Sequence, residues 1–144
     1  MVWAKTNPTP ATNGCWLPDL EYCLVFKEEG KHKYNDGYNL KSKWYQSPIN
    51  KSDKDLFEHP TIKPLEYVKR HLQHACGKDF VVLDTFLGSG TTAVACKELG
   101  LNYIGFEKEP KYYEIAVNRL KGLTKQDREL KEKGQISLFD IIGE

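Results

Sequence analysis

The segment Val81–Ala93 reads VVLDTFLGSGTTA and predicts a buried strand, a glycine turn and the start of a helix. Its first three residues are apolar, as in a strand covered on both faces. Gly88 and Gly90 have no Cβ, so the backbone can turn sharply and a ligand can lie close to it. The following helix presents unpaired N–H groups and the positive end of its dipole. The segment therefore predicts a cofactor-binding turn.

A second strand is predicted one helix later, at residues 102–107 (NYIGFE). Its last residue, Glu107, falls about 20 residues past the turn, where a ribose-binding acid belongs in a strand–helix–strand unit. Gly88, Gly90 and Ala93 also satisfy the loose dinucleotide pattern, which alone is weak. A glycine turn in an ordinary α/β unit without a ligand is the alternative. No Gly-Lys-Ser/Thr follows, so a nucleoside-triphosphate loop is excluded.

Two motifs in this order resemble one family. Asp84–Thr92 (DTFLGSGTT) resembles the S-adenosylmethionine loop of the amino-group DNA methyltransferases, which modify adenine at N6 or cytosine at N4. His59–Pro64 (HPTIKP) looks like the second cofactor segment of that family, HPTxKP. The order resembles the permuted branch, in which the cofactor half follows the catalytic half. The HPTIKP segment and the acid at Asp84 argue against an NAD-dependent oxidoreductase fragment.

The resemblance implies an α/β fold: a partial Rossmann-like methyltransferase sheet with an N-terminal β-hairpin and flanking helices. It divides the chain into four parts. These are strands after the catalytic loop (1–29), a short target-recognition loop (30–58), the S-adenosylmethionine-binding βαβ region (59–121) and a charged tail (122–144).

By this resemblance, S-adenosylmethionine lies across the C-terminal ends of the two parallel strands. Glu107 would accept hydrogen bonds from the ribose hydroxyls and Phe106 would flank the adenine. Asp84 would lie near the ammonium group, and Thr61 and Lys63 would hold the carboxylate. The expected cofactor-binding residues are His59, Pro60, Thr61, Lys63, Asp84, Phe86, Gly88, Ser89, Gly90, Thr91, Phe106 and Glu107.

The catalytic loop of the family, Asp/Asn/Ser-Pro-Pro-Tyr/Phe/Trp, does not occur in this sequence, in which no two prolines are adjacent. In the family this loop binds the target amino group and stacks on the flipped base. The resemblance places its strand between the Phe80–Asp84 and Val2–Lys5 strands. We therefore expect no catalytic residue in this chain and an acceptor loop supplied by another chain or segment. An inactive remnant that binds only cofactor or DNA is the alternative.

Composition sets further bounds. The 144 residues suit one domain, and the net charge of +1 gives no global electrostatic case for nucleic acid. The four cysteines, at 15, 23, 76 and 96, lack metal-ligand spacing, which predicts free thiols and no metal site. No apolar leader or membrane-length run occurs, so we expect a cytoplasmic protein.

Residues 30–58 interleave lysines with aromatic residues, and no helical or strand period runs through them. The target-recognition region of the family lies here. Lysines would contact phosphates and aromatic rings would stack on bases. A polar loop whose aromatic rings pack on the domain is the alternative. The expected DNA-binding residues are Lys31, Lys33, Lys41, Lys43, Trp44 and Tyr45.

Three helices are predicted around the motifs, at residues 64–76, at residues 91–99 and from Pro110 onward. Gly100 ends the second. The inner face of the third is predicted to carry Tyr113, Ala116, Val117 and Leu120.

The charged tail ends in an apolar peptide. Gln135, Leu138 and Phe139 lie in a stretch that resembles the sliding-clamp binding motif of bacteria, Gln-Leu-Ser/Asp-Leu-Phe. Such a peptide behind a polar linker suits recognition in a groove. The alternative is a tail that packs back on the domain.

Overall fold

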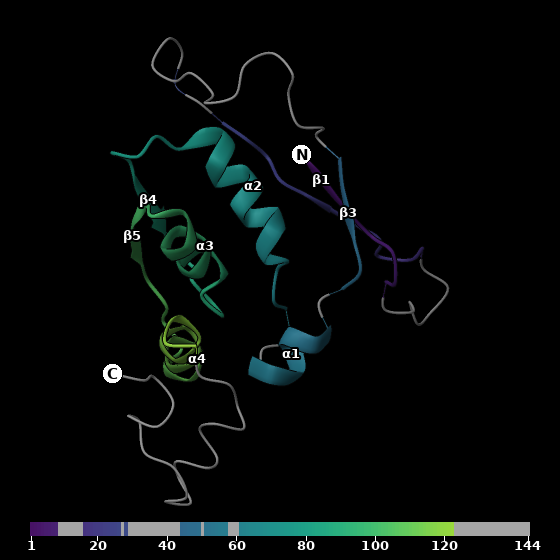
Figure 1. The fold of residues 1–144 in the computed structure, drawn as a ribbon. Coiled ribbons are helices and arrows are strands. Elements are labelled where there is room, and N and C mark those ends of the chain that lie inside the picture. The colour runs from purple at the N-terminus through teal and green to yellow at the C-terminus, as the bar shows by residue number, and fades with distance from the viewer. Residues whose placement is uncertain (9–15, 27, 29–43, 50, 58–60, 123–144) are drawn as a thin grey trace, which may run out of the picture.

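The computed structural model describes residues 1–8, 16–26, 28, 44–49, 51–57 and 61–122 (Figure 1). Within these residues the elements follow in the order β1 (Val2–Lys5), β2 (Leu20–Tyr22), β3 (Trp44–Ser47), α1 (Lys51–Phe57), α2 (Leu65–Ala75), β4 (Val81–Asp84), α3 (Thr91–Leu99), β5 (Asn102–Gly105) and α4 (Pro110–Leu120). The predicted mixed α/β fold is confirmed.

The glycine segment forms the predicted strand–helix–strand unit. Strands β4 and β5 pair in parallel, from Val81 opposite Asn102 to Asp84 opposite Gly105. A parallel pair needs a crossover connection, and α3 provides it. This helix begins after Gly90 and ends at Gly100, both of which have left-handed backbone angles. Both predicted ends of the helix are confirmed.

The N-terminal sheet has the order β2-β1-β3. Strand β1 runs antiparallel to β2, as the predicted hairpin requires, and parallel to β3. Residues 30–58, expected to be a target-recognition loop without a helical or strand period, contain β3 and α1. Both elements are too short to show a period, and β3 exists because its backbone pairs with a strand about 40 residues away in sequence.

Helix α2 lies between the N-terminal sheet and α3 (Figure 1). Its Tyr67 ring contacts Trp3 of β1 and Tyr45 of β3, with ring centroids 6.3 Å and 5.3 Å away. Leu72 packs on the opposite side against Ala95 and Cys96 of α3. Helix α2 therefore packs on the N-terminal sheet with one side and on α3 with the other.

The N-terminal sheet and the β4–β5 pair are not hydrogen-bonded to each other in the described residues. The expected strand of the catalytic loop was placed between β4 and β1. However, both edges of β1 are already occupied, by β2 and by β3. A strand between the two sheets therefore cannot pair with β1 itself and would adjoin an outer strand of the N-terminal sheet.

One face of the β4–β5 pair is open in the described residues. Val82 packs towards the core formed with α3, whereas Val81 and Leu83 are 57% and 61% exposed. Ile104 of β5 is also exposed. We call Val81, Leu83 and Ile104 the outer face. Because parallel sheets are usually covered on both sides, this surface is unusual for such a pair.

Helix α4 begins with Pro110 in its first turn, as predicted. Its predicted inner face is partly wrong, because Tyr113 is exposed, whereas Ile115, Ala116 and Arg119 are buried. The helix is rotated so that its small residue, Ala116, meets the glycine turn at Gly90.

Among the helices of the described ranges, none is long and apolar enough to cross a membrane.

Candidate cofactor site

The turn after β4 continues the hydrogen bonding of the sheet. The Phe106 N–H donates to the Asp84 carbonyl at 2.8 Å, and the Leu87 N–H donates to the Phe106 carbonyl at 2.9 Å. The Asp84 carboxylate accepts the Phe86 N–H at 3.0 Å. These bonds fix the path of the backbone between the strand and the two glycines.

Both glycines of the turn have positive φ angles, +54° at Gly88 and +77° at Gly90. At Gly90 a Cβ would also lie 2.9 Å from the Cβ of Ala116, closer than real side chains approach. Glycine is therefore required there for two reasons, backbone angle and contact with α4.

The Glu107 carboxylate closes the turn. Its Oε2 accepts the Gly88 N–H at 2.7 Å and its Oε1 accepts the Glu109 N–H at 2.9 Å. Charge-assisted bonds of this kind are short and strong. A carboxylate oxygen can accept more than one hydrogen bond. Glu107 thus ties the end of β5 to the turn, a role that the sequence alone did not indicate.

A cavity of about 230 Å³ lies beside the turn. Its lining includes Thr61, Lys63, Asp84, Phe86, Gly88, Ser89 and Thr91, all expected from the sequence. Val68, Leu87 and Thr92 also line it and were not expected. Leu87 and Thr92 lie inside the motif, which could have indicated them. Val68 belongs to α2, and no local signal marks it as a cavity residue.

The remaining expected cofactor residues lie elsewhere. The cavity lining does not include Gly90, Phe106 or Glu107. Glu107 nevertheless accepts the N–H of Gly88, which does line the cavity. His59 and Pro60 lie outside the described residues. The Phe86 ring is 90% exposed, so it presents an apolar surface at the cavity that the chain itself does not cover.

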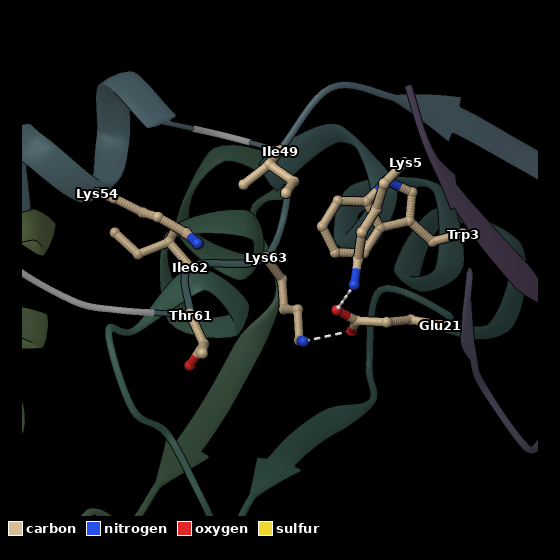
Figure 2. A pocket seen from close by; sticks show the side chains of 8 residues that line it. All are labelled: Trp3, Lys5, Glu21, Ile49, Lys54, Thr61, Ile62 and Lys63. Carbon is tan, nitrogen blue, oxygen red and sulfur yellow. Dashed lines mark hydrogen bonds and ion pairs between the residues drawn. The ribbon is translucent and has the colours of Figure 1, made fainter. Parts of the chain in front are cut away.

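Figure 2 shows the residues that line a second cavity, of about 270 Å³. Thr61 and Lys63 line both cavities. In the second cavity, the Glu21 carboxylate binds Lys5, 2.9 Å away, and Lys63. Burial alone would raise the pKa of Glu21, but hydrogen bonds from Lys63 and Lys5 hold this pKa below its usual value. Both ammonium groups also lie near the Trp3 ring. The Lys63 ammonium is therefore directed to Glu21 in this structure.

The expected DNA-binding residues are only partly within the described ranges. Trp44 is half-exposed, whereas Tyr45 packs on Tyr67 of α2, as the alternative of aromatic packing on the domain expects. Lys31, Lys33, Lys41 and Lys43 lie outside the described residues. The clamp-motif residues Gln135, Leu138 and Phe139 also lie outside them.

Potential metal ligands do not cluster in the part of the chain that the structure describes. No group of three or more His, Cys, Asp or Glu side chains could hold a metal ion there. Cys23, Cys76 and Cys96 are thiols, and burial raises the pKa of Cys96 to about 11. Such a thiol is a core residue and not a nucleophile at neutral pH.

The sequence matches a known protein family and its members. The model of the DNA methylase family N6_N4_Mtase matches residues 1–118. The chain belongs to this family. It is 33% identical over 137 residues to the Type II methyltransferase M2.LlaDCHI of Lactococcus lactis subsp. cremoris, covering 86% of this chain and 51% of that protein. It is 32% identical over 132 residues to M2.DpnII of Streptococcus pneumoniae, covering 83% and 49%. The chain thus spans about half the length of these relatives.

Solved structures agree with the family. The crystal structure of the M1.HpyAVI–SAM complex matches with a TM-score of 0.71 and 33% identity, over 83% of this chain and 60% of that one. The cytosine-N4-specific PvuII DNA methyltransferase matches with a TM-score of 0.51 at 19% identity, over 64% and 36%, and shows a shared fold. This member of the family thus has the Rossmann-like fold that the resemblance of its sequence implies.

Proposed function

We propose that this chain is the S-adenosylmethionine-binding part of a DNA methyltransferase that methylates an exocyclic base amine. The observation that carries the proposal is the cavity at the glycine turn, with Glu107 bonded to the Gly88 N–H. Support also comes from the family match over residues 1–118 and from the likeness to M1.HpyAVI, which was crystallised with SAM.

The residues at the turn fit this cofactor. Gly88 lacks a side chain, so a cofactor can approach the protein backbone there. The Asp84 carboxylate lines the same cavity, where we propose that it faces the cofactor ammonium group. Two backbone N–H groups orient the Glu107 carboxylate, and we propose that its remaining lone pairs accept the ribose hydroxyls. The exposed Phe86 and Phe106 rings offer apolar surface for the adenine.

Lys63 can serve the cofactor carboxylate only by sharing its ammonium with Glu21 or turning away from it. The ammonium group has three donors, and the side chain lines both cavities. We therefore propose that Lys63 stands between the two cavities, with Glu21 holding it when the first cavity contains no anion. Thr61 lies at the same boundary.

When bound, the cofactor supplies an electrophilic methyl group on sulfur. The residues of this chain then act by binding and orienting: the turn fixes one end of the cofactor and Glu107 fixes the ribose. Holding two reactants in line lowers the barrier without a metal or a covalent intermediate. The acceptor amine, with the Pro-Pro loop that binds it, comes from outside these residues in this proposal.

We propose that the acceptor part docks on the outer face, Val81, Leu83 and Ile104. These apolar residues are exposed in a parallel sheet, which normally has both faces covered. Strand β4 pairs only with β5 in the described residues, so its other edge can accept a further strand. The relatives are about twice as long as this chain's match to them, which leaves room for such a part.

Adenine N6 is the acceptor that we propose ahead of cytosine N4, because N6 enzymes are the commoner members of the family that the sequence resembles. DNA is the proposed substrate. A catalytically inactive protein that binds cofactor or DNA is the rival proposal, since the described residues contain no acceptor loop.

Calorimetric titration with S-adenosylmethionine, with NAD as the control, tests the cofactor proposal. We expect S-adenosylmethionine alone to bind. Binding of neither ligand, or of NAD, would contradict the proposal.

Methyl transfer tests the rest. Labelled methyl groups should reach DNA only when a segment carrying the Pro-Pro loop is added, and digestion of the product should show N6-methyladenine. Leu83→Glu should abolish this complementation and leave cofactor affinity within about twofold, because the exposed side chain is outside the cavity. Cofactor binding with no transfer under any complementation would favour the inactive protein.

A further inference from the structure

Arg119 is a buried charge that the cofactor proposal does not use. The residue lies on α4, 30 positions after Ser89, and is only 7% exposed. Burial lowers the pKa of its guanidinium, and the nearby Asp53 carboxylate offsets part of that effect. Arginine nevertheless stays protonated in proteins. Burying a charge costs free energy of desolvation unless hydrogen-bond and ion-pair partners offset it. The partners of Arg119 therefore indicate its role.

On one side, Arg119 reaches the glycine turn. Its Nη1 donates to the Thr91 hydroxyl at 2.8 Å. The same nitrogen lies 3.3 Å from the Ser89 carbonyl and 3.3 Å from the Ser89 hydroxyl. Ser89 and Thr91 are themselves buried, and they flank Gly90. The guanidinium therefore joins the residues before and after the left-handed glycine, both of which line the cavity, while Arg119 itself does not.

On the other side, Arg119 contacts α1. Its Nη2 lies 3.5 Å from an Asp53 carboxylate oxygen, and its guanidinium carbon lies 5.1 Å from the centre of the Phe57 ring. Helix α1 belongs to the region 30–58, which is otherwise distant in sequence from the turn. One side chain thus connects α4, the turn and α1.

We propose that Arg119 is a positioning residue that holds the Ser89–Thr91 part of the turn in its cofactor-binding shape and couples that shape to α1. It touches no substrate and acts through Ser89 and Thr91. The inference rests on the proposed binding of S-adenosylmethionine. It adds that affinity for this cofactor depends on a residue outside both cofactor motifs and on the placement of α1.

The proposal predicts that lysine cannot replace Arg119. A guanidinium presents several donors in a rigid plane and can meet the turn and Asp53 at once, whereas an ammonium is a compact point charge. Arg119→Lys keeps the charge and the aliphatic stem, so we expect this variant to fold. Asp53→Asn keeps the shape of the α1 partner and removes its charge.

Lys97 provides a matched control. It is also basic, and its Nζ joins α3 to α4 by donating to the Leu120 carbonyl at 2.7 Å. This contact is exposed and lies at the end of α3 remote from the turn. Lys97→Met therefore removes a basic link between the same two helices without touching Ser89 or Thr91.

The test compares affinities of the full 144-residue chain for S-adenosylmethionine and adenosine by calorimetry. Arg119→Lys should weaken S-adenosylmethionine binding about tenfold or more, the scale of one lost charge-assisted hydrogen bond. Adenosine should lose less than about threefold, because it lacks the methionine part of the cofactor and in the proposed site its ribose binds Glu107. Asp53→Asn should lose about threefold for S-adenosylmethionine, and Lys97→Met should bind as the wild type does. A change shared equally by both ligands would indicate a general loss of structure and overturn the proposal.

A second measurement needs no ligand. Amide hydrogen exchange at Gly88 and Gly90 should be faster in Arg119→Lys than in the wild type, with exchange in β4 and the middle of α3 unchanged. Unchanged exchange at the turn would overturn the positioning role whether or not the chain binds cofactor. Failure of the wild type to bind S-adenosylmethionine, with faster exchange in the variant, would instead contradict the proposed function alone.

Discussion

The two halves of the molecule are held together by different kinds of contact. In the β4–α4 region, backbone N–H groups, two left-handed glycines and a carboxylate close a turn in which Ser89 and Thr91 are buried. In the N-terminal sheet, aromatic rings join two of the three short strands to α2, and an ion-pair cluster joins β1 and β2 to Lys63, just before that helix. Backbone hydrogen bonds hold the turn in one conformation, and a cofactor site needs binding groups that are fixed in this way. Changes at the turn should therefore alter binding, and changes in the aromatic contacts of the N-terminal sheet should alter stability alone.

The largest effect is expected at Gly90. Gly90→Ala should destabilise the chain by about 2–4 kcal/mol, because the left-handed angle costs about 1–2 kcal/mol and the new Cβ meets Ala116. The free energy of unfolding in urea measures this. Gly100→Ala is the control, since its φ of +66° is similar but nothing lies within 4 Å of the new Cβ. Equal losses in the two variants would show that α4 does not press on the turn.

Glu107 should have the next largest effect, on binding. Glu107→Ala should weaken affinity for S-adenosylmethionine by about 1–3 kcal/mol, the range for hydrogen bonds to a charged group. The variant also loses the bond to the Gly88 N–H, so part of the loss reflects a looser turn. Calorimetry of the folded variant measures the change. An affinity equal to that of the wild type would remove Glu107 from the proposed site.

A side-chain contact in the N-terminal sheet should show the opposite behaviour. The buried Trp3 indole donates its N–H to the Ser47 hydroxyl at 2.9 Å. Ser47→Ala should cost about 1 kcal/mol of stability, because the indole N–H loses its partner. Affinity for S-adenosylmethionine should stay the same. A clear loss of affinity in thermally stable protein would mean that the two halves are not separable in this way.

The smallest effect is expected at Glu21, and it should depend on pH. Hydrogen bonds from Lys63 and Lys5 lower the folded-state pKa of this carboxyl below its ordinary value of 4.5. The ion pairs of Glu21 with these lysines therefore stabilise the fold at pH values above the unfolded-state pKa. That contribution is lost as pH falls through the folded-state pKa. It is small, because the Glu21 side chain is about a third exposed.

The variant that tests this is Glu21→Gln. Its melting temperature should lie slightly below that of the wild type at pH 7, and the two should converge as pH falls below 4.5. A constant difference down to pH 3 would mean that the Glu21 charge contributes nothing.

The same contrast explains what could be predicted from the sequence. The turn, α3 with both of its glycine ends, and Pro110 at the start of α4 follow from local residues, because φ angles and helix ends are local properties. Strand β3 and Val68 of the cavity depend on pairing and packing between distant segments. Arg119 was not indicated by its position on a helix face, since its burial arises from Ser89, Thr91 and Asp53, which are far from it in sequence.

The direct test of the central claim is a titration of isotope-labelled chain with S-adenosylmethionine, followed by the amide signals of each residue. The account predicts that the largest shifts occur at Gly88, Ser89 and Gly90 and at the Glu109 N–H, which shares the Glu107 carboxylate. Signals of β1 and β2 should move little. Shifts centred on the N-terminal sheet, or saturable binding that leaves the Gly88 signal unchanged, would contradict the assignment of the glycine turn as the cofactor site.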